Sequence, residues 1–194
     1  MKFPSACVII ISTQTNGGIG LYAVGDFVVY GIHGVCTVVN IEQQQLGGHV
    51  RRYYVLEPVE QTGTRFMLPI DNPSVMGKVR ALMTGEELEQ ILQSEAVQKD
   101  CWIEDENQRR KHYRELITSG EQLALIRMIG TLERHKIAQA LAGRKFHLSD
   151  ENFLRDAKKL VESEISMVLG MEKTQAGAYI REKLGIEETA AAIF

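Results

Sequence analysis

The chain has 194 residues, of which 44% are hydrophobic and 24% charged, and its formal net charge is −3 at pH 7. This composition is typical of a folded globular protein, and the length suits one ordinary domain or two small ones. No apolar run approaches the roughly 20 residues of a membrane-spanning helix, so we expect no membrane partner. Cys7, Cys36 and Cys101 are far apart, which argues against a disulfide framework or zinc site and favours the cytoplasm.

Residues 1–21 form an extension of doubtful origin. Residues 6–11 are apolar but too few for the core of a signal peptide, and residues 12–18 are typical of a flexible linker. One hypothesis is that Leu21 is a misread alternative start codon, so that the native protein lacks the extension. The alternative is that the extension adds an edge strand.

Residues 22–74 contain short segments rich in β-branched and aromatic residues, separated by Gly, Asn and Pro. The expected strands are residues 27–30, 35–41, 51–58 and 64–69. Gly47 and Gly48 are typical of a hairpin turn. The pattern predicts a small, strongly bent antiparallel β-barrel of Tudor or SH3 type as the first domain.

From residue 78 to residue 190 the apolar period changes from two to about 3.6, which predicts an all-α helical bundle. The fold class is therefore α+β with two domains. Thr84 and Glu87 have the spacing of a capping box at the start of a short helix. Further helices are expected at about residues 100–118, 121–142, 149–169 and 174–184.

Basic residues concentrate in the middle of this second domain. Residues 109–145 contain nine basic and three acidic residues, a local net charge of +6 in an otherwise acidic chain. Such a patch indicates a surface that binds a polyanion. A solvated helix face is the commoner explanation of such a patch when no other feature supports binding.

Several motifs resemble those of the CarD family of bacterial transcription regulators. In the first domain they are VGDFVVY at 24–30, HGV at 33–35, YYVL at 53–56 and MLPIDN at 67–72. They occur in the order of the family's RNA-polymerase-interacting domain, which transcription-repair coupling factors share. In the second domain, Trp102, RRKHYR at 109–114 and SGE at 119–121 resemble the family's DNA-binding domain. The resemblance covers roughly residues 22–171.

The resemblance implies two partners, the β subunit of RNA polymerase and promoter DNA at the upstream edge of the transcription bubble. Trp102 would act as a wedge at the minor groove, and cations would hold the phosphates. These candidate DNA-binding cations are Arg109, Arg110, Lys111 and Arg114. From the residues alone, the favoured interpretation of Trp102 is a packing residue that docks its helix on the bundle or the barrel, and the resemblance favours the wedge instead.

Two departures from the family pattern affect the expected sites. Four extra residues separate Trp102 from the basic run, which on a continuous helix would shift the ring by about 6 Å along the axis. Where some relatives place arginines against the polymerase, this chain has Gln44 and Met67. The candidates that would substitute for them are Arg51, Arg52 and Arg65.

We found no motif of an enzyme, such as GxGxxG, GxxxxGK[ST], HExxH or GxSxG, and we expect no cofactor and no metal. The leading hypothesis is a transcription regulator that binds polymerase and DNA and stabilises the open complex. The alternative is a protein–protein adaptor that does not contact DNA. Under the leading hypothesis, replacing Trp102 with Ala should leave the fold intact.

Overall fold

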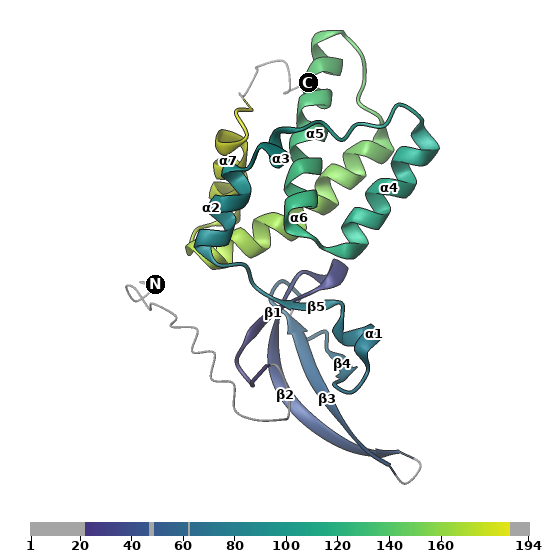
Figure 1. Ribbon diagram of the computed structural model, residues 1–194, viewed down its shortest axis with the longest axis vertical. Coiled ribbons are helices and arrows are strands. Elements are labelled where there is room, and N and C mark those ends of the chain that lie inside the picture. The colour runs from purple at the N-terminus through teal and green to yellow at the C-terminus, as the bar shows by residue number, and fades with distance from the viewer. Residues whose placement is uncertain (1–21, 47–48, 62, 187–194) are drawn as a thin grey trace.

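The computed structural model describes residues 22–46, 49–61 and 63–186. Within this range the chain forms an antiparallel sheet followed by a helical region, and the two stack end to end (Figure 1). The predicted α+β organisation is therefore confirmed. The expected extension, with the proposed start at Leu21, lies outside the described residues.

The sheet has five strands in the order β4-β3-β2-β1-β5, and all neighbours are antiparallel. The strands are β1 (Phe27–Tyr30), β2 (Val35–Leu46), β3 (His49–Pro58), β4 (Phe66–Pro69) and β5 (Val79–Ala81). β4 and β5 are its edges, so the described sheet is open and the predicted closed barrel is not confirmed.

The longest strands, β2 and β3, form a hairpin that projects away from the helices (Figure 1). Leu46 pairs with His49, which brings the strand ends together around the predicted turn. The turn residues themselves, Gly47 and Gly48, lie outside the described residues. The register shifts between Val38 and Asn40, and a bulge of this kind bends and twists the hairpin.

Two elements between the domains were not predicted. Helix α1 (Pro73–Met76) is capped by Asn72, whose side chain accepts hydrogen bonds from two backbone N–H groups. Strand β5 then pairs with β1, with Val29 opposite Arg80. Because β5 belongs to the sheet, the sheet extends beyond the expected domain end at residue 74.

The helical region contains α2 to α7, which cover the end of the sheet that carries β5 (Figure 1). Their bounds are α2 (Gly85–Gln93), α3 (Glu95–Gln98), α4 (Glu106–Ser119), α5 (Gln122–Leu141), α6 (Leu148–Leu169) and α7 (Lys173–Lys183). The predicted capping box of Thr84 and Glu87 is present. Gly120 ends α4 in the left-handed conformation, with φ 66°, which favours glycine.

The helix expected from residue 100 begins later, at Glu106, and the preceding residues are not helical. Asp105 caps α4 by accepting a hydrogen bond from the Gln108 N–H at 2.8 Å. The expectation that Trp102 lies on the same helix as the basic run is therefore wrong. The estimated shift of one helical turn, which assumed a continuous helix, does not apply.

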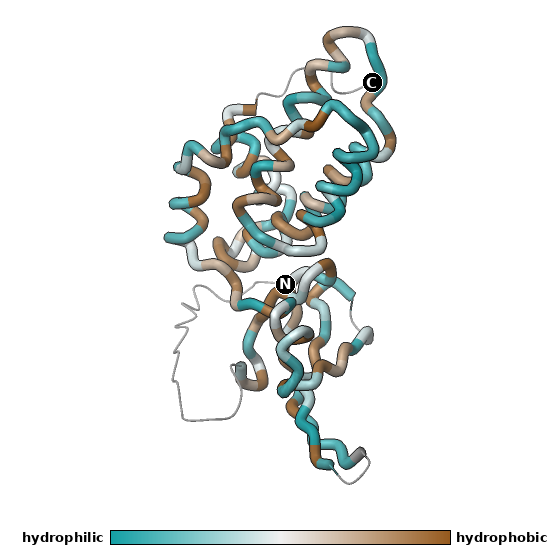
Figure 2. The backbone as a smooth tube through the Cα atoms, turned by 45° about the vertical axis from the view of Figure 1, so that its right-hand side comes forward, coloured by the Kyte–Doolittle hydropathy of each residue, from teal (hydrophilic) through white to brown (hydrophobic). Residues whose placement is uncertain are grey.

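Each domain has its own hydrophobic core. The sheet core contains Val28, Val38, Tyr54 and Leu56, and the helical core contains Leu88, Ile126, Ile129, Leu132 and Ile165, with other apolar residues. By contrast α4 is rich in polar residues and is largely teal in Figure 2. Among the described helices none has the length and apolar character needed to cross a membrane.

A polar contact joins the two domains. Arg80 of β5 donates two hydrogen bonds to the Glu164 carboxylate of α6, at 2.7 and 2.8 Å. The same guanidinium donates to the Gly120 carbonyl at the end of α4, at 3.2 and 3.3 Å. Glu164 also accepts the Met83 N–H at 2.9 Å. This contact fixes the sheet relative to α4 and α6.

Candidate functional site

The basic run of α4 is divided between two faces of the helix. Arg110, Lys111 and Arg114 are exposed to solvent, whereas Arg109 and Tyr113 point inward and are buried. Residues three and four apart share a helix face, so the three exposed cations form one continuous stripe. Arg110 also lies 3.7 Å from Glu106 one turn earlier. We call Arg110, Lys111 and Arg114 the cationic stripe.

Arg109 does not belong to this stripe. It is 5% exposed and forms a two-bond ion pair with Asp150 of α6, at 3.1 and 3.0 Å. Its remaining amino group donates to the Ile103 and Glu104 carbonyls. These contacts use the guanidinium inside the protein, so the expected phosphate contact by Arg109 does not fit its place in the structure.

Trp102 packs on the helical domain. Its indole stacks on the His135 imidazole of α5, with ring centroids 3.9 Å apart and planes 9° apart. The guanidinium carbon of Arg109 lies 4.1 Å from the indole centroid, a cation–π distance. The ring is half-buried against the helical core. These contacts fit the packing interpretation, and the exposed part of the ring stays available to a partner.

Side chains of α5 hold the backbone of the non-helical segment that carries Trp102. Arg127 donates to the Lys99 and Asp100 carbonyls, and Thr131 accepts the Cys101 N–H at 3.1 Å. Arg127, Thr131 and His135 are spaced four residues apart and therefore share one face of α5. This polar stripe on a largely apolar helix was not recognised in the sequence, although its spacing was visible there.

Asp100 links this segment to His135. Its carboxylate accepts the Trp102 N–H at 2.8 Å and lies 3.1 Å from Nε2 of His135. Partial burial disfavours the ionised form, but the hydrogen bonds from His135 and Trp102 outweigh it and lower the pKa of Asp100. The lowered pKa means that the contacts with His135 and Trp102 favour the ionised form of the Asp100 carboxyl group.

The basic stretch 109–145 therefore does not act as one patch. Five of its nine cations contact groups of the chain itself: Arg109, Arg110, Arg127, Arg134 and Lys136. Arg144 and Lys145 are exposed in the connection between α5 and α6. Nearby, His147 lies 3.7 Å from Glu106 at the start of α4. This contact brings the end of that connection beside the first residue of α4.

The candidate polymerase-binding residues of the sheet partly gather on one face. Gln44 is paired with Arg51 across β2 and β3, and paired residues project to the same side. Gln44 Nε2 lies 3.9 Å from the sulfur of Met67 on the edge strand β4. Arg65 joins this face through its 3.2 Å ion pair with Glu57. Met67 is 43% exposed, so the face is accessible to a partner.

Arg52 does not share this face. It follows Arg51 along β3, and successive side chains in a strand project to opposite sides of the sheet. Its cross-strand partner is Gln43. The structure therefore brings Gln44, Arg51, Arg65 and Met67 together and separates Arg52 from them.

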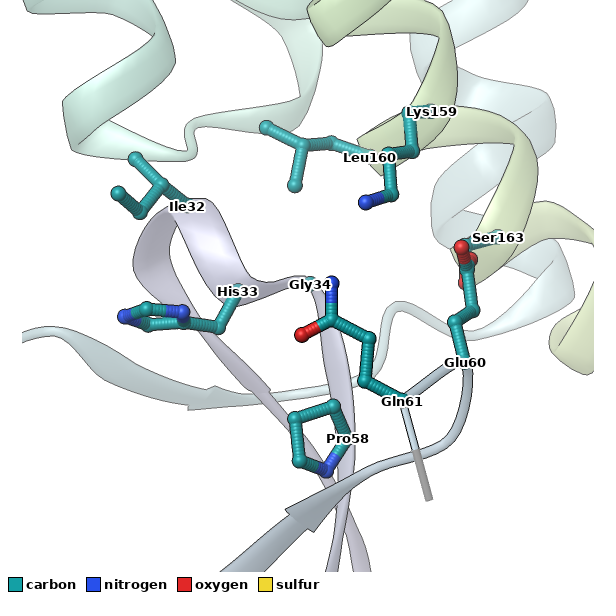
Figure 3. Close-up of a pocket in the computed structure, with 9 residues that line it drawn as sticks. All are labelled: Ile32, His33, Gly34, Pro58, Glu60, Gln61, Lys159, Leu160 and Ser163. Atoms are coloured by element: carbon teal, nitrogen blue, oxygen red, sulfur yellow. The ribbon is translucent and has the colours of Figure 1, made fainter. Parts of the chain in front are cut away.

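A small pocket lies where the domains meet (Figure 3). Ile32 and His33 of the short 3₁₀ helix η1 (Gly31–His33), which joins β1 to β2, line it together with Gly34. Lys159 and Leu160 line it from α6. Gly34 has φ 72°, and a Cβ there would lie 3.6 Å from Leu160. His33 packs against Tyr30 and Phe66, with ring centroids 5.0 and 4.2 Å away. These contacts give His33 and Gly34 a packing role at the junction.

Within the described residues, no group of three or more His, Cys, Asp or Glu side chains is placed to hold a metal ion. Two surfaces are the candidate functional features of the described residues. One is the cationic surface of the helical domain, and the other is the sheet face around Met67.

Two family models match consecutive parts of the chain. The CarD-like/TRCF RID domain matches residues 22–80, and the C-terminal domain of CarD matches residues 87–181. The first model covers the sheet through nearly all of β5, and the second covers α2 to most of α7. No curated protein matches the chain.

Proposed function

The chain belongs to the CarD family, a family of transcription factors that are not enzymes, and we propose that it stabilises the open promoter complex. Its RID domain is an RNA-polymerase-interacting domain. In this proposal the sheet binds the polymerase β subunit in the cytoplasm. The helical domain binds promoter DNA at the upstream edge of the bubble.

The observation that carries the DNA-binding part is the cationic stripe on α4. Arg110, Lys111 and Arg114 are exposed on one helix face, and Arg144 and Lys145 are exposed in the connection between α5 and α6. Cations that neutralise phosphates bind DNA without reading its sequence. Trp102 supplies a half-buried aromatic ring in the non-helical segment that precedes α4.

The polymerase-binding part is supported by the face around Gln44, Arg51, Arg65 and Met67. Gln44 and Arg51 lie on the hairpin that projects away from the helices, and Met67 lies on the edge strand β4 beside that hairpin (Figure 1). A partner bound there leaves the cationic stripe uncovered. The Arg80–Glu164 contact holds the two surfaces at a fixed separation, so polymerase binding would place α4 at a defined position on the DNA.

A protein that binds the melted promoter more tightly than the closed one shifts the equilibrium toward the melted state. The tether to polymerase raises the local concentration of the helical domain at the promoter, so weak DNA affinity is sufficient. The protein need not recognise a particular DNA sequence. The charge of the DNA backbone and the deformable junction at the edge of the bubble would provide its preference for the melted promoter.

A pull-down with the polymerase β subunit tests the tether. We expect the wild-type chain to be retained and the Met67→Glu variant to be retained less, because a carboxylate would be placed at the centre of the proposed face. The matched control is Val24→Glu, which alters another exposed apolar residue, 58% exposed, outside that face. Failure of the wild-type chain to bind would remove the tether.

Salt dependence tests the DNA contact. Each phosphate contact contributes about 0.9 to the slope of log K against log salt, so Lys111→Ala should lower the slope by about that amount for polymerase-bound promoter. Lys183→Ala is the control, since α7 lies on the other side of the helical domain from α4 (Figure 1). Equal slopes for wild type and Lys111→Ala would favour the adaptor that does not contact DNA.

A further inference from the structure

Trp102 is part of a closed set of contacts with Asp100 and His135. Asp100 accepts the Trp102 backbone N–H through Oδ1 and contacts His135 Nε2 through Oδ2. The imidazole of His135 in turn stacks on the indole at 3.9 Å. The orientation of the ring is thus set both by its own backbone and by α5.

Arg109 supports the ring from α4. Its guanidinium carbon lies 4.1 Å from the indole centroid. The guanidinium cannot easily turn away, because Asp150 binds it through two oxygens and the Ile103 and Glu104 carbonyls accept its remaining hydrogens. Arg109 and Asp150 are 5% and 1% exposed, so this support is part of the protein interior.

We propose that His135 and Arg109 are positioning residues that hold the Trp102 indole in one orientation before DNA arrives. This rests on the proposed function, in which Trp102 contacts promoter DNA. A side chain that is ordered before binding loses little further freedom on association, and a rigid aromatic ring offers a large contact area. The role of Arg109 is thus to order a neighbouring ring, in place of the phosphate contact suggested by its position in the basic run.

Tryptophan fluorescence tests the positioning directly, because Trp102 is the only tryptophan in the chain. His135→Ala removes the stacking partner, and His135 is partly exposed, so the fold should survive. In the full chain without polymerase or DNA, we expect lower fluorescence anisotropy and stronger quenching by acrylamide. His135→Phe restores a ring and should restore both values.

The control is Lys136→Ala, which removes the neighbouring cation of α5 and its ion pair with Glu151. It should leave the fluorescence of Trp102 unchanged. Circular dichroism melts of the variants confirm that each remains folded at the temperature of the measurement. Unchanged anisotropy and quenching in folded His135→Ala would overturn the proposal.

The second readout is the half-life of open promoter complexes with polymerase. Because His135 orders one side chain, we expect His135→Ala to shorten the half-life by about two- to tenfold. His135→Phe should keep most of the wild-type half-life. Altered fluorescence with a wild-type half-life would overturn the proposal, since ring order would then serve no DNA contact. If the wild-type chain itself did not extend the half-life, the proposed function would be refuted, and the fluorescence would still decide whether His135 orders the ring.

Discussion

Arg109 and Arg110 are adjacent in the sequence but occupy different faces of α4. Arg109 stabilises the interior of the helical domain, whereas Arg110 faces solvent. Arg109 is buried and binds Asp150, whereas the side chain of Arg110 is 46% exposed. The helical period points the two side chains in different directions, and packing against α6 buries the face that carries Arg109. Charge counted along the sequence therefore overestimates the charge that a polyanion meets at the surface.

The largest expected effect comes from the buried member of this pair. Arg109→Ala leaves the Asp150 carboxylate buried without its cation, and removal of one partner of a buried ion pair costs about 3–5 kcal/mol. Arg110→Ala is the matched control and should change the free energy of unfolding by less than about 0.5 kcal/mol. Urea denaturation followed by circular dichroism measures both. Similar values for the two variants would show that the faces of α4 do not differ as described.

Arg80 extends the comparison to the domain junction. Arg80→Ala leaves Glu164, which is 2% exposed, with only its backbone partner. Because the Arg80 side chain is 29% exposed, we expect a smaller loss of about 2–3 kcal/mol. Arg65→Ala is the control, since it breaks the surface pair with Glu57 and should cost about 0–1 kcal/mol. A loss no greater than that of Arg65→Ala would mean that the junction contact contributes little to holding the domains together.

Trp102→Ala should have an intermediate effect on stability. The sequence led us to expect an intact fold with no loss, but the contacts with His135 and Arg109 predict a loss of about 1–2 kcal/mol. Trp102→Phe keeps a ring in the same place and should recover part of this loss. Thermal melts of the three proteins measure the difference. A melting temperature unchanged by Trp102→Ala would refute the stacking described here.

The smallest expected effect is a pH dependence from Asp100. Its pKa in the folded chain lies below the ordinary value, so its contribution to stability is present above pH about 4 and is lost as the pH falls through the folded pKa. Asp100→Asn removes this contribution. The stability difference between wild type and variant should therefore be larger at neutral pH than at pH about 3. A difference that stays constant over this range would contradict the role assigned to the carboxylate.

Local signals in the sequence predicted much of the fold. The capping box of Thr84 and Glu87 and the glycine at residue 120 mark helix ends through groups a few residues away. Strand β5 was missed because its three residues are held by pairing with β1, about fifty residues earlier. Such a pairing has no local pattern.

The candidate site was predicted less completely for the same reason. The three cations of the stripe were among the predicted residues because the basic run is continuous in the sequence, and their role in binding DNA stays a prediction. The burial of Arg109 depends on Asp150, which is 41 residues away, and the place of Trp102 depends on His135. The spacing of Arg127, Thr131 and His135 on one face of α5 is the signal that would have indicated a segment packed there.

The lifetime of open promoter complexes tests the central claim most directly. It should be measured with polymerase alone, with the wild-type chain, and with a variant in which Arg110, Lys111 and Arg114 are all Ala. We expect the wild-type chain to prolong the lifetime and the triple variant to lose most of this effect while still binding the β subunit. A wild-type chain that leaves the lifetime unchanged, or a triple variant as active as wild type, would contradict the account.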